Sequence, residues 1–109
     1  QRFPAHGVDR LQADVDFHSM IYAASGNPLI VESMQTHWQH LRRSMGEVLQ
    51  RPRFAQRVWK EHAAVLDAIA AGDADAAARL LAEHVREAHE RVGAELAPPV
   101  PVPAPACAA

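Results

Sequence analysis

Hydrophobic side chains recur at three- and four-residue steps through most of the 109-residue chain, a spacing that gives an α-helix one apolar face. The pattern covers four stretches, residues 9–24, 28–49, 54–71 and 74–96. Asp9, Asn27 and Asp73 are placed to accept hydrogen bonds from first-turn amides. Gly26 and Gly72 are typical helix stops. The pattern predicts an all-α fold, an antiparallel bundle of four main helices.

One side of each predicted helix is expected to face inward. A short break at Arg51–Arg53 separates the second helix from the third. The inward positions, in chain order, are Leu11, Asp14, Val15, His18, Ile21 and Tyr22; Ile30, Met34, Trp38, Leu41, Met45 and Val48 or Leu49; Val58, His62, Val65 or Leu66 and Ile69; and Leu80, Leu81, His84, Val85, Ala88 and Val92. A chain of this length can bury one such core but not two.

The composition changes after Leu96. Residues 97–109 are rich in proline and alanine and carry five of the eight prolines, so no helix or central strand can persist there. We therefore expect a helical domain over residues 1–96 and a disordered tail over 97–109. The single cysteine, Cys107, cannot form an internal disulfide, and no apolar run reaches the roughly 20 residues of a membrane span. The sequence therefore predicts a cytoplasmic protein that does not associate with a membrane.

The charge balance limits the choice of partners. The formal net charge is −2, and DNA binding relies on a basic excess that this chain lacks. Any contact with DNA is therefore expected to come from another segment.

Four ionisable residues occupy the inward faces, where unpaired polar groups are costly. Asp14 and His18 are four residues apart and nearly stack on one helical face, while His62 and His84 each interrupt an apolar stripe. Facing helices lie roughly 8–10 Å apart, a span that two imidazoles and a metal ion can bridge. The alternative is that each histidine is a hydrogen-bonded core residue.

The remaining histidines are interpreted as surface or packing residues: His6, His37, His40 and His89. Among them, His37 and His40 are the best alternative candidates for a pair of metal ligands, because they share one helix at a three-residue step.

The motif Asp14-Val-Asp-Phe-His18, with Ala24-Ser-Gly-Asn-Pro28, Glu61-His62, Gly72-Asp73 and His84, resembles the FCD domain, the C-terminal ligand-binding domain of GntR-type transcriptional regulators of the FadR subgroup. The resemblance covers roughly residues 8–92. It implies a helical bundle that binds one divalent metal through Asp14, His18, His62 and His84, with zinc the first choice and nickel, manganese or iron as alternatives. It also implies a small carboxylic acid effector, a homodimer, and DNA binding through a separate N-terminal winged helix-turn-helix.

The resemblance also indicates what this chain lacks. Family members carry the DNA-binding module and about two further bundle helices before the motif, so the chain is expected to be an N-terminally truncated form of a larger bundle. An arginine that usually meets the effector carboxylate has no counterpart. Arg42 and Arg43 are candidate effector-binding substitutes, although a basic run of this kind is more often a solvated surface.

The predicted function is an effector-sensing and dimerisation domain, not an enzyme. Two alternatives stay open: a metal-dependent helical-bundle enzyme, since an open coordination position can activate water, and a structural dimerisation module without metal.

Overall fold

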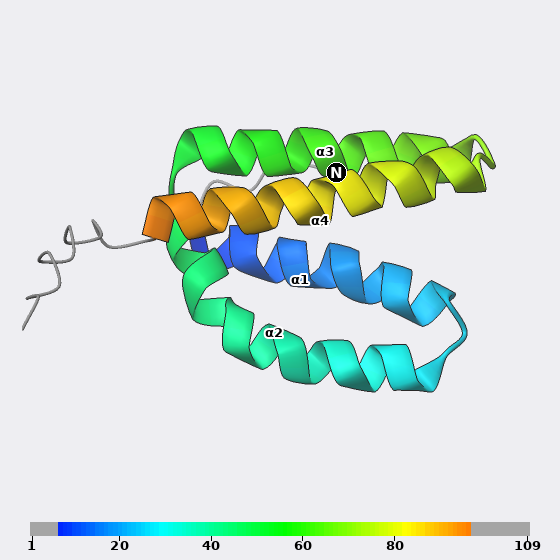
Figure 1. Ribbon diagram of the computed structural model, residues 1–109, viewed down its shortest axis with the longest axis horizontal. Coiled ribbons are helices and arrows are strands. Elements are labelled where there is room, and N and C mark those ends of the chain that lie inside the picture. The colour runs from blue at the N-terminus through cyan, green and yellow to red at the C-terminus, as the bar shows by residue number, and fades with distance from the viewer. Residues whose placement is uncertain (1–6, 97–109) are drawn as a thin grey trace, which may run out of the picture.

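The computed structural model describes residues 7–96, which form four helices and contain no strand. The helices are α1 (Gly7–Ala24), α2 (Pro28–Val48), α3 (Pro52–Ala70) and α4 (Ala74–Leu96). Consecutive helices run antiparallel, and α1 pairs with α2 while α3 pairs with α4 (Figure 1). A further contact between α2 and α4 joins the two hairpins. The prediction of an all-α antiparallel bundle is confirmed.

The turns within the two hairpins are built as the sequence predicts. Gly26 and Gly72 have φ angles of 70° and 73°, a left-handed conformation that glycine adopts without strain. Asn27 Oδ1 accepts a hydrogen bond from the Leu29 amide at 3.0 Å. Asp73 Oδ1 accepts one from the Ala76 amide at 3.0 Å. Each turn therefore combines a glycine stop with a side chain that caps the next helix.

Two helix starts differ from the prediction. Asp9 was expected to cap α1, but the helix already begins at Gly7 and Asp9 lies in its first turn. A carboxylate at this position still interacts favourably with the positive end of the helix dipole. The third helix begins at Pro52 and not at Phe54. Proline suits the first helical position because the amide it lacks would have no partner there, so the break around residue 51 is shorter than predicted.

Loss of the Asn27 cap is expected to destabilise the domain. Asn27→Ala removes the acceptor for the Leu29 amide and should lower the free energy of unfolding by about 1 kcal/mol. Asn27→Ser, which retains a capping oxygen, should stay within a few tenths of a kcal/mol of wild type. Urea unfolding followed by circular dichroism measures both. Equal stability of the two variants would show that the cap contributes nothing.

The buried members of the main core come from α2, from α3 and from the turn between them. They are Trp38, Met45, Val48, Leu49, Phe54, Ala55, Val58 and Trp59. Arg10 on α1 is also buried, and its Nη1 donates to the Leu49 carbonyl at 2.9 Å, which ties the first turn of α1 to the residue that follows α2. Within residues 7–96, no helix combines the length and the apolar character needed to cross a membrane.

Three residues predicted to face inward are exposed. Ile30 is 40% exposed, Ile69 48% and Val85 54%. Ile30 follows the α1–α2 turn and Ile69 precedes the α3–α4 turn, at the end of the bundle where the two hairpins separate (Figure 1). Helical periodicity locates a face but not the distance to the next helix, so it does not reveal that Ile30 and Ile69 lie where the hairpins have separated.

Candidate metal centre

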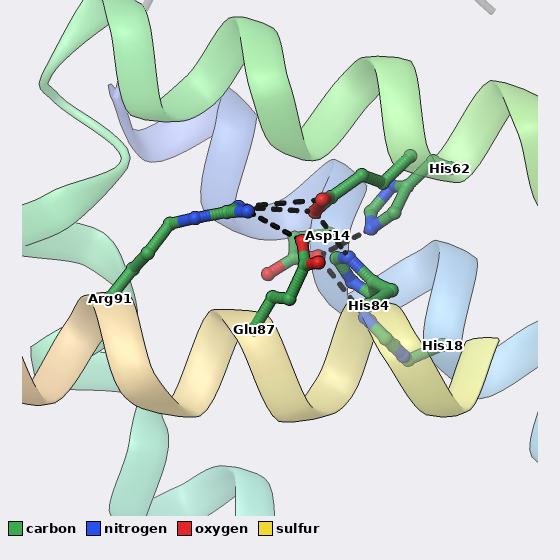
Figure 2. Close-up of polar contacts among 7 residues, drawn as sticks. Asp14, His18, His62, His84, Glu87 and Arg91 are labelled. Carbon is green, nitrogen blue, oxygen red and sulfur yellow. Dashed lines mark hydrogen bonds and ion pairs between the residues drawn. The ribbon is translucent and has the colours of Figure 1, made fainter. Parts of the chain in front are cut away.

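The four residues predicted as metal ligands are all buried, and three helices carry them. Asp14 and His18 lie on α1, His62 on α3 and His84 on α4, with exposed fractions between 1% and 6%. Figure 2 shows their side chains pointing toward one another in the interior. The structure therefore brings together the whole predicted set.

The potential ligand atoms form a compact group. One ring nitrogen from each of His18, His62 and His84 lies within 4.8 Å of the others. Asp14 Oδ1 is 3.4 Å from His18 Nε2 and 3.2 Å from His62 Nε2. Two nitrogens bound to one ion at about 2.1 Å are at most about 4.2 Å apart. A small contraction of the side chains would bring the nitrogens to that spacing.

Several of these polar atoms have no hydrogen-bond partner among the described residues. They are Asp14 Oδ1 and both ring nitrogens of His62. The contacts between Asp14 and the imidazoles are close enough for an ion pair but lack the alignment of a hydrogen bond. Buried polar atoms without partners cost roughly 1–3 kcal/mol each. A carboxylate with three imidazoles is a donor set for zinc and related divalent ions, so these residues fit a metal.

The electrostatics favour the protonation states that metal binding requires. Burial raises the pKa of Asp14, but the contacts and charges of His18 and His62 outweigh it and lower the pKa to about 2. Burial lowers the pKa of His62, and the opposing effect of Asp14 does not reverse the shift. Asp14 is thus ionised and His62 is neutral near pH 7, as ligands must be.

Phe17 and Glu61 support the cluster, although the sequence assigned them no role. The Phe17 ring stacks on His62 with a centroid distance of 3.8 Å and fixes the plane of the imidazole. Glu61 Oε1 lies 3.0 Å from His84 Nδ1. Both belong to the short motifs of the family resemblance, which is the one sequence signal that could have singled them out.

A cavity of about 190 Å³ lies beside the cluster. Its lining includes Asp14, His18 and His84, and its other members are Tyr22, Met34, His37, Trp38, Leu41, Met45, Val58, Val85, Ala88, His89 and Val92. The lining is mainly apolar and comes from all four helices. His37 and His89, interpreted from sequence as surface or packing residues, are exposed but also line this cavity.

The structure does not bring the two candidate effector arginines to the cavity. Arg42 and Arg43 are both exposed, and neither belongs to the cavity lining. Arg42 lines a separate hollow between α1 and α2. His40 is exposed and lies outside the cavity lining, while His6 lies outside the described residues.

Comparison of the sequence with family models identifies the family of the chain. The model described as the FCD domain matches residues 3–87, which is most of the chain. The chain belongs to the FCD domain family. The FCD domain is the C-terminal, effector-binding domain of GntR-family transcriptional regulators, so the predicted family and regulatory class are confirmed.

Curated relatives agree with this assignment. Proteins of Escherichia coli (strain K12) and Shigella flexneri, each provisionally named L-lactate dehydrogenase operon regulatory protein, are both 39% identical to this FCD domain over 83 residues. The match covers 72% of this chain and 32% of each relative, so the chain spans about a third of their length. Both are named as regulators and not as enzymes, in line with the prediction that the chain is not an enzyme. No solved structure gives a significant match.

Proposed function

We propose that this FCD domain binds one divalent metal through Asp14, His18, His62 and His84 and a small organic carboxylate in the adjoining cavity. Together they would control DNA binding by a separate N-terminal domain of a homodimeric regulator. The observation that carries the proposal is the convergence of buried polar atoms that lack hydrogen-bond partners among the described residues.

The donor set narrows the choice of metal. Three neutral imidazoles and one carboxylate suit zinc best, and nickel, manganese and iron(II) accept the same ligands. When bound, such an ion would supply positive charge and open coordination positions for an oxygen ligand. Asp14, His18, His62 and His84 would hold the ion. The Phe17 ring stacked on His62 and the Trp38 ring near His18 place apolar surface beside these ligands.

The cavity indicates the class of effector. At about 190 Å³ it is smaller than the roughly 300–1,000 Å³ typical of pockets for drug-sized ligands, so a small molecule fits best. Its apolar lining suits a short aliphatic part, and the imidazoles of His37 and His89 can donate to carboxylate or hydroxyl oxygens. Because the relatives are named for an L-lactate dehydrogenase operon, a 2-hydroxy acid such as L-lactate is the first candidate.

Effector binding would be coupled to DNA binding because both hairpins contribute side chains to the cavity lining. The cavity draws side chains from both hairpins, with Tyr22 and Trp38 from one and Val58 and Ala88 from the other. A ligand that contacts both hairpins favours the hairpin arrangement to which it binds most tightly. That differential affinity is the free energy available to change the placement of the DNA-binding domains in a dimer.

Elemental analysis and ligand-dependent unfolding test the proposal. The purified 109-residue chain should contain close to one equivalent of zinc or a related metal. L-lactate and other 2-hydroxy acids should raise the melting temperature of the loaded protein but not of protein stripped with a chelator. A chain that neither retains nor rebinds metal would be a structural helical module, and the proposal would be wrong.

Filling the cavity should separate acid binding from metal binding. Ala88 lines the cavity and is not one of the four ligands, so Ala88→Leu places three further carbon atoms there. We expect the variant to keep its metal and to lose most of the acid-dependent rise in melting temperature. Ala82→Leu, on the exposed side of α4, is the matched control and should respond like wild type. An Ala88→Leu variant with an unchanged acid response would place the effector elsewhere.

A further inference from the structure

Glu61 lies one residue before His62 on α3, yet its carboxylate points to a different part of the site. Adjacent helical residues are about 100° apart, so Glu61 lies beside the buried face and reaches toward α4. Its Oε1 is 3.0 Å from His84 Nδ1. The His84 side chain is 3% exposed and that of Glu61 20%, so the contact is largely shielded from water.

This contact determines which nitrogen of His84 is free. An ionised carboxylate only accepts hydrogen bonds, so Nδ1 of His84 is the donor. A neutral imidazole has one N–H group, which leaves the lone pair on Nε2 of His84. Metal-binding histidines commonly donate their second nitrogen to a carboxylate in this way, which fixes both tautomer and ring orientation. Glu61 therefore presents Nε2 of His84 to the cluster.

Arg91 restrains Glu61 from α4. Its Nη1 is 3.4 Å from both Oε1 and Oε2 of Glu61, and its Nη2 donates to Glu87 Oε2 at 2.6 Å. Figure 2 shows Arg91 and Glu87 extending from α4 toward the cluster. Glu87 lies one helical turn before Arg91 on α4 and holds its guanidinium in place. The guanidinium in turn limits rotation of the Glu61 carboxylate.

His62 has no comparable support. Within the part of the chain that the structure describes, neither ring nitrogen of His62 has a hydrogen-bond partner. The contact of Glu61 is with His84, so loss of the Glu61 carboxylate should act first on the imidazole of His84.

We propose that Glu61 is a positioning residue of the metal centre, which selects the Nδ1–H tautomer of His84 and aims its Nε2 at the ion, and that Arg91 holds Glu61 in place. This inference rests on the proposed function, because it assumes that the cluster binds a metal.

Glu61→Gln tests the inference against Glu83→Gln. Glu83 is a matched control because it lines, together with Glu61, a surface hollow between α3 and α4, immediately precedes His84 and undergoes the same change of charge. Zinc affinity, measured by competition with a chromophoric chelator, should fall about 10- to 100-fold in Glu61→Gln and stay unchanged in Glu83→Gln. Glu61→Asp separates charge from contact, because it keeps the charge but is too short to hold the 3.0 Å contact. It should bind zinc as weakly as Glu61→Gln.

A second readout does not depend on metal. In chelator-treated protein, ¹⁵N chemical shifts of the His84 ring should report the Nδ1–H tautomer in wild type and a mixture of tautomers in Glu61→Gln. A purely structural role for Glu61 would lower the melting temperature without altering these shifts.

The outcomes distinguish the two proposals. A wild-type chain that binds no zinc overturns the proposed function and this inference with it. A wild-type chain that binds zinc, with Glu61→Gln matching Glu83→Gln in affinity and in His84 tautomer, overturns the role of Glu61 alone.

Discussion

Replacing His62 with leucine should abolish metal binding while leaving the metal-free domain folded. His62 is 1% exposed and would supply one of four ligands. Loss of a residue that only hydrogen-bonds to a metal ligand can weaken binding by roughly 100-fold, so loss of the ligand His62 itself should weaken zinc binding by more than that. Saturation at 100 times Kd adds about 2.7 kcal/mol to the stability of a protein, and the variant should lose this gain. Zinc titration and urea unfolding with and without zinc measure the two effects.

Opposing contributions should keep the metal-free stability close to that of wild type. Leucine removes two buried nitrogens that lack hydrogen-bond partners among the described residues, which is favourable. It also removes the stacking on Phe17 and one of the two imidazole contacts of Asp14, which is unfavourable. We expect a net change within about 1.5 kcal/mol of wild type.

His40→Leu is the matched control, because His40 is exposed on α2 and lies outside the cavity lining. It should bind zinc as wild type does. Retention of wild-type zinc affinity by His62→Leu would remove His62 from the site and would contradict the proposed centre.

The sequence predicts most of this fold because the signals that define it are local. Asn27 and Asp73 cap their helices through residues two or three positions away. The convergence of His62 and His84 also follows from one turn. They lie 10 residues before and 12 residues after Gly72, so an antiparallel hairpin brings them to nearly the same level.

Features that depend on the distance between hairpins could not be predicted. The exposure of Ile30 and Ile69 results from the separation of the hairpins at one end, which no spacing within a single helix encodes. The same applies to the cavity and to the inclusion of His37 and His89 in its lining.

The positions of Arg42 and Arg43 on α2 bear on the prediction that they bind the effector. Leu41 and Met45 line the cavity, so the inward side of α2 passes through these two positions. Arg42 and Arg43 are rotated by about 100° and 200° from Leu41, which turns both side chains away. Their basic character suits a carboxylate, but their helical phase places both outside the cavity proposed for the effector.

Acidification from pH 7.5 to pH 5.5 should release the metal and destabilise the metal-free domain. Metal binding requires unprotonated ligands, so protons compete with the ion, and zinc affinity should fall by at least about 10-fold over this range. The metal-free effect follows from His62, whose burial lowers its pKa below the ordinary 6.5. Below pH 6.5 the unfolded chain takes up a proton at this residue that the folded domain resists, so stability falls as the pH falls.

Asp14 affects the stability of the folded domain in a lower pH range than His62 does. Its pKa is about 2 in the folded domain against an ordinary 3.8, so the stability it confers is complete above about pH 4 and is lost as the pH falls toward 2. The two residues can therefore be distinguished by the pH at which stability declines.

Urea unfolding of chelator-treated protein between pH 4.5 and pH 7.5 measures the His62 effect, with His62→Leu as the control. One proton taken up on unfolding corresponds to a slope of at most about 1.4 kcal/mol per pH unit. Wild type should show a steeper loss of stability below pH 6.5 than His62→Leu, because the variant lacks the group whose protonation is coupled to unfolding. Parallel curves for the two proteins would show that His62 takes up protons equally in the folded and unfolded states. Burial of the ring beside Phe17 and the other imidazoles would then not be what keeps it neutral.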